Sequence, residues 1–369
     1  MGPTRAIISH KNLIHNLKLI QKAVRPAGVM GVVKADGYGH GAIEIARTLI
    51  ENGVTYLGVA FAEEGVQLRR AGITVPILVF GSQLPEFFDL YFQYDLDLTL
   101  SAEWQIEPLQ LLCKKYNKKI RIQIKVDTGM GRVGFFHDHD RDKILTILKN
   151  PVFDVKGIYS HLSSADEEDL SYTYGQIERF TALRDFLTKH AAVPLLFHLA
   201  NSAAIMRLPQ ARFDLVRPGV MLYGNPPGAD FPLTWDLKEV MRFVSAVTSV
   251  KHLPAGQPVS YNRRYYTDQP TYIGIIPAGY ADGYNRRLTN KGHVLIRGRR
   301  YPVVGTVCMD QFMVDLGPQT DVQAGDEVVL FGAQDKEHIT IIEISRMLET
   351  IPYEVTCWVS RRVPRVHIK

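Results

Sequence analysis

The residue best suited to chemistry in this chain is a lysine that closes an apolar run. In the stretch VVKADGYGHG (residues 32–41), Lys34 ends the run, and three glycines, Tyr38 and His40 come within the next seven residues. Glycines allow the backbone to approach a ligand closely, and partial burial would lower the pKa of the lysine amine. A neutral amine can condense with an aldehyde, so the pattern suits the attachment of an aldehyde cofactor. Because an arbitrary lysine is more often a surface residue, the rest of the chain must decide.

A second glycine-rich stretch, KVDTGMGRVG (residues 125–134), contains the G-x-G-x-x-G spacing of dinucleotide-binding folds. The helix that those folds require would have to start inside the motif, but charged and imidazole side chains crowd residues 135–143. Asp127 would also place negative charge near a pyrophosphate. We therefore do not favour a dinucleotide site. Alternating His and Asp at residues 137–140 is more typical of a solvated loop than of metal ligands, so we predict no metal site.

Eight short, β-branched apolar runs occupy the first 224 residues, and helical patterns such as residues 62–72 and 174–190 separate most of them. Strands that alternate with helices pair in parallel, and eight such units predict an α/β fold of the (β/α)8 TIM barrel type. In that architecture the active site lies at the carboxyl ends of the strands, which is where Lys34 falls. The runs expected to form the strands are residues 28–35, 55–61, 75–80, 94–100, 119–127, 153–161, 194–200 and 214–222.

A linker rich in proline and glycine, residues 224–237, precedes a region of short alternating runs. Such alternation predicts antiparallel strands, and only residues 339–351 have a helical pattern, with Thr340 as the N-cap. The runs expected to form these strands are residues 241–250, 271–278, 293–307, 312–317 and 327–332. The sequence therefore predicts a barrel domain in residues 1–230 and a mainly antiparallel β domain in residues 231–369.

The composition argues against several classes of protein. Among 369 residues, 43 Lys and Arg oppose 38 Asp and Glu, so the net charge is only +5, and the basic residues are scattered. This pattern predicts no nucleic-acid partner. No stretch approaches 18 consecutive apolar residues, so we expect no membrane association. The three cysteines, Cys113, Cys308 and Cys357, lie far apart without ligand spacing, as expected for a cytoplasmic protein.

Five ordered stretches resemble the alanine racemases, a family of fold-type III enzymes that depend on pyridoxal 5′-phosphate (PLP). They are VVKADGYGHG (32–41), KVDTGMGRVG (125–134), HLANSAAI (198–205) with VRPGVMLYG (216–224), VSYNRRY (259–265) and VGTVCMDQFMVDL (304–316). The resemblance spans nearly the whole chain. It implies a homodimer in which Lys34 carries PLP and acts as one catalytic base. The opposite base would be the partner subunit's Tyr261, because inversion at a carbon needs a base on each face.

The loops after the seventh and eighth strands commonly hold phosphate in barrels, since helix N-termini present free N–H groups there. Ser202 and the N–H groups of Gly219 and Val220 lie in these loops. The resemblance assigns these three residues, together with Tyr353, to the PLP phosphate. Tyr38 is counted as a further cofactor contact, because it follows the attachment lysine closely.

By resemblance, Arg217 contacts the pyridine nitrogen of the cofactor and His161 supports it. An arginine cannot be deprotonated in a protein, so it can only donate to this nitrogen and keeps the ring neutral. A neutral ring withdraws electrons less strongly than a protonated one. Arginine at this place therefore favours a short-lived carbanion and clean reprotonation, which is what a racemase needs.

For the substrate, the resemblance assigns the carboxylate to Arg132 and the backbone of Met309. The residues implied to support the site are Lys125, Cys308, Asp310, Tyr280 and Tyr284. Lys125 is implied to carry a carbamate formed with CO2, although an unmodified lysine paired with an acid such as Asp127 is the ordinary alternative. Tyr280 and Tyr284 resemble the ring of residues that narrows the access corridor, and they could equally be packing residues.

The function that we expect is interconversion of L- and D-alanine by a two-base PLP mechanism, which in a bacterium would supply D-alanine for peptidoglycan. An alanine/serine racemase of broader specificity is an alternative, because a pocket for a methyl group discriminates poorly against the same group with a hydroxyl. A fold-related PLP decarboxylase would place a carboxylate opposite the pyridine nitrogen, and Arg217 argues against it. A PLP-binding protein without turnover would lack residues 241–369, which include Tyr261.

Overall fold

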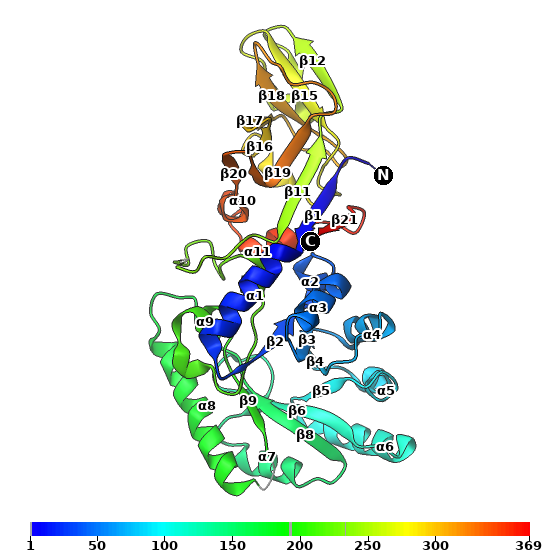
Figure 1. Cartoon of the computed structure of the whole chain (residues 1–369), viewed down its shortest axis with the longest axis vertical. Coiled ribbons are helices and arrows are strands. Elements are labelled where there is room, and N and C mark those ends of the chain that lie inside the picture. The colour runs from blue at the N-terminus through cyan, green and yellow to red at the C-terminus, as the bar shows by residue number, and fades with distance from the viewer. Residues whose placement is uncertain (1, 192–193, 233) are drawn as a thin grey trace.

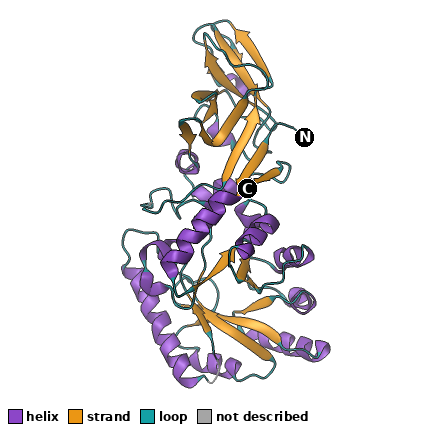
Figure 2. Cartoon of the chain, in the orientation of Figure 1, coloured by secondary structure: helices purple, strands orange, loops and turns teal. Residues whose placement is uncertain are grey.

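The computed structural model describes residues 2–191, 194–232 and 234–369. The chain forms two bodies along its long axis (Figure 1). Helices surround the strands of the first body, whereas the second consists mainly of strands (Figure 2). The first and last strands of the chain, β1 (Arg5–Ser9) and β21 (Arg365–Ile368), pair in parallel. Both ends of the chain are therefore held in the same sheet.

Eight parallel strands form the barrel sheet in the order β10-β2-β3-β4-β5-β6-β8-β9. Between its two edges, Asp214 donates its backbone N–H to the carbonyl of Phe197 and Arg217 donates to that of Ala200, both at 3.0 Å, so the barrel is nearly closed. Each strand lies inside one of the eight predicted runs, which confirms the predicted fold class. The strands are β2 (Gly28–Val32), β3 (Tyr56–Val59), β4 (Ile77–Val79), β5 (Asp97–Leu100), β6 (Ile120–Asp127), β8 (Phe153–Tyr159), β9 (Leu196–His198) and β10 (Leu215–Val216).

Helices cover the outside of the barrel sheet (Figure 2). Two of them, α4 and α8, coincide with the predicted helical patterns at residues 62–72 and 174–190. The α-helices of this body are α1 (His10–Val24), α2 (Lys34–Tyr38), α3 (Ala42–Glu51), α4 (Ala62–Arg70), α5 (Phe88–Gln93), α6 (Ile106–Tyr116), α7 (Arg141–Leu148), α8 (Ser171–His190) and α9 (Ser202–Arg207). The short 3-10 turns are η1 (Pro85–Phe87), η2 (Glu103–Gln105), η3 (Pro209–Ala211) and η4 (Val220–Tyr223), and the two-residue strand β7 (Phe135–Phe136) pairs with β6.

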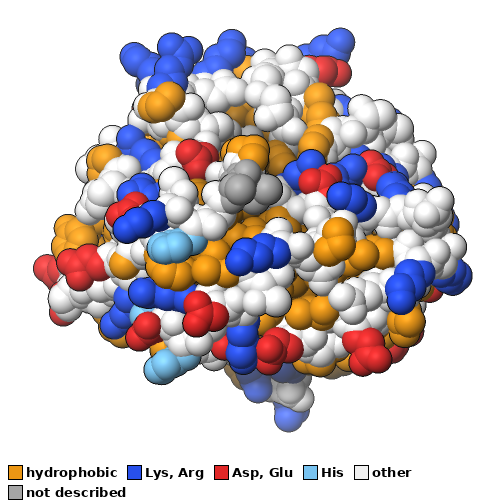
Figure 3. All heavy atoms as spheres, turned by 90° about the horizontal axis from the view of Figure 1, so that it is seen from below, with side chains coloured by type: hydrophobic (Ala, Val, Ile, Leu, Met, Phe, Trp, Pro, Cys, Tyr) orange, Lys and Arg blue, Asp and Glu red, His pale blue; other side chains and the backbone are white. Residues whose placement is uncertain are grey.

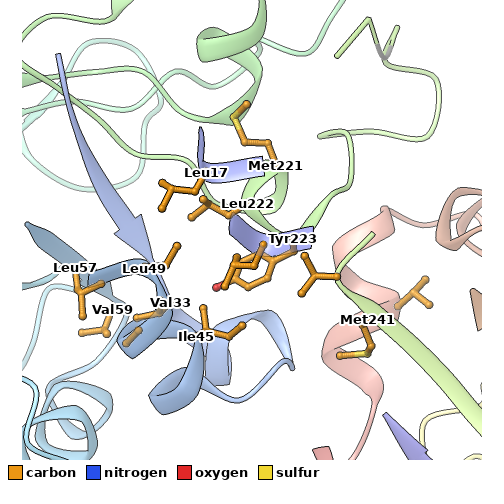
Figure 4. Packing of buried hydrophobic residues seen from close by; sticks show 14 of the residues in the cluster. Leu17, Val33, Ile45, Leu49, Leu57, Val59, Met221, Leu222, Tyr223 and Met241 are labelled. Atoms are coloured by element: carbon orange, nitrogen blue, oxygen red, sulfur yellow. The ribbon is translucent and has the colours of Figure 1, made fainter. Parts of the chain in front are cut away.

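The carboxyl end of β2 is anchored in a cluster of buried apolar side chains (Figure 4). Leu17 of α1, Ile45 of α3, Val33 and Tyr223 all belong to this cluster. The Tyr223 hydroxyl also donates a hydrogen bond to the carbonyl of Val32 at 3.0 Å. Because burial of each such side chain contributes about 1.5–3 kcal/mol, the strand end that precedes the candidate lysine is held firmly in place.

The second body is a mainly antiparallel sheet in the order β12-β15-β18-β17-β16-β19-β11-β1-β21, with β20 paired to β19. All five predicted runs form strands, and the run at residues 293–307 folds into the hairpin β16–β17. The strands after β1 are β11 (Met241–Ala246), β12 (Ser249–Leu253), β15 (Thr271–Ile276), β16 (His293–Ile296), β17 (Arg299–Val304), β18 (Phe312–Gly317), β19 (Glu327–Gln334) and β20 (Glu337–Ile339). A separate pair is formed by β13 (Pro258–Val259) and β14 (Tyr265–Tyr266), and the 3-10 turns here are η5 (Tyr261–Arg263) and η6 (Arg286–Leu288).

Strand β1 joins the second sheet although it comes before the barrel in the sequence. It pairs antiparallel with β11, with Arg5 opposite Val244 and Ile8 opposite Met241. The predicted boundary between a barrel domain in residues 1–230 and a β domain in residues 231–369 remains a proposal. In space, the first strand belongs to the β domain.

Two helices follow strand β20 of the β domain, and the second of them contacts the barrel. Helix α10 (Ile341–Leu348) begins after Thr340, whose side chain accepts the N–H of Glu343, as predicted for this N-cap. Helix α11 (Pro352–Trp358) was not predicted, and it packs against α2 of the barrel. The approach is close, because a Cβ atom at Gly39 would lie 2.3 Å from the carbonyl oxygen of Thr356. Helix α11 therefore contributes side chains to the barrel face.

None of the helices in the described part of the chain is both long and apolar enough to cross a membrane. At the barrel end of the molecule, basic and acidic side chains are interspersed over the surface (Figure 3). The three cysteines are free thiols, with Cys113 buried, Cys308 partly buried and Cys357 exposed.

Candidate active site

A cavity of about 750 Å³ opens where the barrel strands end and their following loops begin. Loops after seven of the eight barrel strands contribute to its wall, and helix α11 adds one side from the β domain. A cavity of this size at this end of a barrel is the usual place for a ligand. Ten residues singled out in the sequence line it, namely Lys34, Tyr38, Lys125, Arg132, His161, Ser202, Arg217, Gly219, Val220 and Tyr353.

Lys34 stands at the start of an unusual turn. Ala35, Asp36, Gly37 and Tyr38 all have positive φ, between 52° and 62°. This left-handed conformation costs about 1–2 kcal/mol for each residue other than glycine, so the surroundings must enforce it. The Glu64 carboxylate accepts the N–H of Ala35 at 2.6 Å, and the Asp36 carboxylate accepts the N–H that begins helix α3 at 2.9 Å. The turn directs the chain away from strand β2 immediately after the lysine.

The environment of Lys34 lowers the pKa of its amine. Burial has the largest effect, and the positive charge of Arg132 lowers the pKa further, while Glu64 opposes the shift. A lower pKa increases the fraction of neutral amine near neutral pH. This is the state that can attack an aldehyde and accept a proton.

One end of the cavity is lined by hydroxyl and N–H groups. The Ser202 hydroxyl oxygen accepts the backbone N–H of Gly219 at 3.0 Å, which leaves its own hydrogen free to donate. A side chain at position 219 would not fit, because a Cβ atom there would lie 2.4 Å from the Tyr38 hydroxyl oxygen. Val220 begins turn η4, so its N–H has no earlier turn of the helix to bond to. Helix α11 brings the Tyr353 ring to 6.3 Å from the Tyr38 ring.

Arg217 is buried at another wall of the cavity and is surrounded by acceptors. Its guanidinium donates to the carbonyl oxygens of Ser160 at 2.5 Å and Leu199 at 3.0 Å. It also donates to Nδ1 of His198 at 2.7 Å and lies 3.3 Å from Nδ1 of His161. Since a guanidinium cannot accept, both imidazoles must present an unprotonated Nδ1. Burial and the charge of Arg217 hold the pKa of both histidines well below the usual value, so both rings are neutral.

A chain of buried hydrogen bonds leads from Arg217 into the barrel. His198 donates from Nε2 to the amide oxygen of Gln123 at 2.5 Å. The Gln123 amide nitrogen donates to the hydroxyl of Tyr56 at 2.8 Å, and Tyr56 donates to the carboxylate of Asp97. Each donor in the chain has one acceptor, so the position of every proton is fixed. Such a network holds the Arg217 guanidinium in one orientation.

Lys125 is a second cavity lysine with an altered pKa. It is almost fully buried, and its ammonium donates to the carbonyl of Val126 at 2.9 Å. Burial, and then the charges of Arg217 and Arg132, lower the pKa of Lys125 to about 7. Both forms of this amine are therefore present near neutral pH.

Five of the residues assigned to the site lie outside this cavity, on an exposed part of the β domain. They are Tyr261, Tyr280, Cys308, Met309 and Asp310, which we call the β-domain cluster. Their segments are bonded together, since Tyr280 donates its N–H to the carbonyl of Cys308 at 3.1 Å and Thr306 donates to that of Tyr261 at 2.8 Å. Tyr261 is 69% exposed and Met309 is 52% exposed. The structure thus brings these residues to one another but not to Lys34 of the same chain.

Tyr284, which the sequence groups with Tyr280, is buried in the β domain. Its ring stacks on Phe312 with 4.5 Å between centroids, and its hydroxyl finds no partner among the described residues. A packing position of this kind is the alternative considered for Tyr284 from sequence. Its role in narrowing access to the site remains a prediction.

Several residues that shape the site were not singled out in the sequence. Tyr159 lines the cavity, with its ring stacked on that of His198 at 4.9 Å between centroids and the Lys125 amine 5.3 Å from its centroid. Asp166 is the single carboxylate among the described residues that line the cavity, and Cys357 on α11 also lines it. Tyr159 ends strand β8, Asp166 lies in the loop after it and Cys357 lies in a helix that was not predicted, so only the fold brings them together. The buried polar residues inside apolar runs were a signal available in the sequence, because such groups must find partners.

Two family models match almost the whole chain. The model described as "Alanine racemase, N-terminal domain" matches residues 8–227, and the model described as "Alanine racemase, C-terminal domain" matches residues 240–367. Among curated relatives, the alanine racemase of Carboxydothermus hydrogenoformans is 42% identical over 369 residues and covers 100% of both chains. The alanine racemase of Halothermothrix orenii is 45% identical over 340 residues, which are 91% of this chain and 89% of that one.

Solved structures give the same result. The crystal structure of alanine racemase from E. faecalis matches with a TM-score of 0.94 at 36% identity and covers 100% of this chain and 98% of that chain. The alanine racemase from Bacillus anthracis with bound L-Ala-P matches with a TM-score of 0.93 at 34% identity and covers 100% of this chain and 96% of that chain. The similarity therefore includes both bodies of the molecule.

Proposed function

This chain belongs to the alanine racemase family and is an isomerase, and from that premise we propose that it interconverts L- and D-alanine as a PLP-dependent homodimer. One observation carries the proposal. A single cavity brings together a lysine with a lowered pKa, an arginine that can only donate, and a group of hydroxyl and N–H donors. These are the partners that an aldehyde, a pyridine nitrogen and a phosphate need.

The residues of the cavity fit PLP. Lys34 would hold the aldehyde, and Arg217 would donate to the pyridine nitrogen. Of the described residues that line the cavity, four are lysine or arginine and only Asp166 is acidic, so the cavity favours an anionic ligand. The residues that would hold the phosphate are Tyr38, Ser202, Gly219, Val220 and Tyr353. When bound, PLP withdraws electrons from the substrate carbon next to the amine and makes the proton on that carbon removable.

Two groups must then exchange protons with the substrate carbon, one on each face. Lys34 has the position and the lowered pKa to serve one face. Tyr261 lies outside the cavity of its own chain, so we propose that the partner subunit's Tyr261 serves the other face. The exposed apolar surface of Tyr261 and Met309 supports a dimer, because such surfaces mark contacts between proteins.

The substrate carboxylate would bind Arg132 from one chain and the backbone of the partner's Met309, beside the partner's Cys308 and Asp310. Arg132 lines the cavity and lies close enough to lower the pKa of Lys34. Tyr353 also lines the cavity, so it is placed to narrow the access together with the partner's Tyr280. Racemisation of serine at a lower rate would fit the same site, because an added hydroxyl is a weak basis for rejection.

The other candidate functions fit less well. A decarboxylase would need a carboxylate at the position of Arg217, whose four acceptor neighbours suit a donor only. A PLP-binding protein without turnover would not need the β domain with its exposed cluster. We further propose that the enzyme acts in the cytoplasm, in keeping with its three free thiols, and that its D-alanine supplies peptidoglycan.

Borohydride reduction of the PLP-loaded enzyme, followed by peptide mapping, should find the pyridoxyl group on Lys34. Lys125 is an internal control, because it lies in the same cavity and also has a lowered pKa. A label on Lys125 or on any other lysine would contradict the assignment. Chiral analysis with L-alanine, L-serine and L-lysine tests the reaction itself, and a PLP-loaded enzyme that racemises no alanine would refute the proposed function.

Lys125 should carry a carbamate formed with CO2. The amine reacts only when it is neutral, and its pKa of about 7 makes the neutral form available in the fold. The protonated amine of Lys125 repels the positive charges of Arg132 and Arg217. A carbamate is negative, so it would replace this repulsion by charge-assisted hydrogen bonds to the two arginines. Carbon-13 NMR of enzyme equilibrated with labelled CO2 should show the signal above pH 7, and the signal should fade below pH 7 as the amine is protonated.

The Lys125→Ala variant should lose this carbamate signal. Because a hydrogen bond to a charged group contributes about 1.5–3 kcal/mol, its KM for alanine should rise about tenfold or more, while PLP binding changes less. Small carboxylates such as acetate should restore part of the activity. An active wild-type enzyme without the carbon-13 signal would exclude the modification.

A further inference from the structure

The loop that carries Arg132, residues 128–134, is rich in glycine and needs external support. Gly129, Gly131 and Gly134 have φ values of 128°, 68° and 123°. Glycine adopts such positive φ values more easily than any other residue. Such a sequence gains little rigidity from its own backbone. The Asp127 carboxylate holds one side of the loop by accepting backbone N–H groups, among them that of Gly129 at 2.7 Å and that of Arg132 at 3.2 Å.

Helix α8 holds the other side of the same loop through its carbonyl groups. The Tyr172 hydroxyl donates to the carbonyl of Gly129 at 2.6 Å, and Arg179 donates from Nη1 to the carbonyl of Thr128 at 2.9 Å. Residues seven apart lie on one face of a helix, and the Arg179 guanidinium lies 5.7 Å from the centre of the Tyr172 ring. We call Tyr172 and Arg179 the α8 clamp.

The close contact between the clamp and the loop depends on Gly129. A Cβ atom at this position would lie 2.6 Å from the Tyr172 hydroxyl oxygen and 3.0 Å from Nη1 of Arg179. The loop and the helix therefore fit without space for another side chain. Neither residue of the clamp lines the cavity, so neither is placed to touch the substrate or the cofactor.

We propose that Tyr172 and Arg179 are positioning residues that hold the 128–134 loop so that Arg132 points its guanidinium at the substrate carboxylate. The proposal rests on the function proposed above, because that function assigns the carboxylate to Arg132. It adds two residues on helix α8 that set the affinity for the carboxylate without contact to the substrate.

The physical argument concerns the population of the binding-competent loop. With the clamp in place, Asp127 fixes the N–H groups and helix α8 fixes the carbonyl groups of adjacent peptide units. Without the clamp, the three glycines allow the loop to adopt other conformations. The apparent affinity for the carboxylate then falls in proportion to the fraction of molecules whose loop is in the binding-competent conformation. The bases and the PLP contacts lie on other loops, so kcat should change less than KM.

The test uses the full-length PLP-loaded enzyme with Tyr172→Phe and Arg179→Met, singly and together. Loss of one hydrogen bond should raise the KM for alanine and the Kd for propionate by about three- to tenfold, and the double variant should exceed either single variant. Propionate carries the carboxylate without the amine, so its binding reports on the carboxylate site, to which Arg132 contributes the positive charge. Hydrogen exchange of the peptide that contains residues 128–134 should become faster, while the PLP absorption spectrum stays unchanged.

Tyr174→Phe is the matched control. Tyr174 lies on the same helix and is 45% exposed, compared with 47% for Tyr172, but it makes no side-chain hydrogen bond to the loop in the described structure. This variant should keep the wild-type KM, propionate affinity and loop exchange. An equal effect in both tyrosine variants would assign the change to helix α8 as a whole and would overturn the proposal.

Unchanged propionate affinity in the double variant would also overturn the proposal, whatever the exchange rate of the loop. A wild-type enzyme that binds PLP and propionate but racemises no alanine would refute the proposed function instead. In that case, propionate affinity and loop exchange in the variants still decide whether the clamp positions Arg132.

Discussion

Mixed dimers of Lys34→Ala and Tyr261→Phe chains should recover the racemase activity that neither homodimer retains. Each homodimer lacks one of the two bases in both of its sites, and loss of a positioned base lowers the rate by about 10²–10⁴-fold. In the mixed dimer, the Tyr261→Phe chain supplies Lys34 to one site, and its partner, the Lys34→Ala chain, supplies Tyr261. This one site therefore has both bases. The expectation follows from the structure, because Tyr261 is 69% exposed and does not line the cavity of its own chain.

The measurement needs dissociation of the two homodimers, mixing, reassociation and separation of the mixed species by two different affinity tags. Tyr266→Phe is a suitable control, since Tyr266 is an exposed tyrosine of the same β13–β14 segment and belongs to no part of the proposed site. Chains with this change should remain active as homodimers. Verified mixed dimers without activity would show that both bases act from one chain.

The barrel could be predicted from the sequence because its strands are buried on both faces. Such strands appear as nearly continuous apolar runs, and the runs at residues 55–61 and 75–80 contain β3 and β4. The run at residues 28–35 was too long, since β2 ends at Val32 and the chain then turns into the left-handed conformation. That turn depends on Glu64, which lies 29 residues after Ala35, so no local pattern could have indicated it.

Long-range pairing limits what the sequence predicts about the domains. Strand β1 is placed by its partners β11 and β21, which lie far along the chain, and its own five residues do not reveal this choice. Helix α11 was missed although Pro352 at its first position is a typical helix start. Its importance comes from the contact with α2, which brings Tyr353 to the cavity.

The motifs indicated ten of the residues that line the cavity but not the network behind them. Asp97, Gln123 and His198 are buried polar residues of strands β5, β6 and β9. Only the barrel shows that they form a continuous chain from Tyr56 to Arg217. The pattern could have suggested buried pairs, because isolated polar groups in a core are costly, but not which residues pair.

Replacement of Arg217 by Glu should slow racemisation by about 10²-fold or more, the usual scale for loss of a preorganised electrostatic partner. Arg217 donates toward four acceptors, which are two carbonyl oxygens and the Nδ1 atoms of His161 and His198. A carboxylate cannot donate to any of them. It would instead accept a hydrogen bond from a protonated pyridine nitrogen of PLP, and its negative charge would favour that protonated form, so the ring should become protonated.

A protonated ring stabilises negative charge on the substrate carbon for longer. A long-wavelength absorption band should therefore appear during turnover of alanine by Arg217→Glu, and exchange of the substrate α proton with solvent should outpace inversion. Stopped-flow spectra and proton NMR in deuterated water measure the two effects. The change should also reach His198, because its Nδ1 loses the donor that fixes the orientation of the ring.

Arg217→Lys separates charge from geometry. Lysine keeps a positive donor but cannot reach four acceptors, so its racemisation should slow without the long-wavelength band. PLP content and thermal unfolding of both variants show whether the buried network survives the exchange. A folded, PLP-loaded Arg217→Glu enzyme with the wild-type rate and spectrum would mean that Arg217 is remote from the pyridine ring. An arginine that can only donate could then no longer explain why this cavity favours racemisation over decarboxylation.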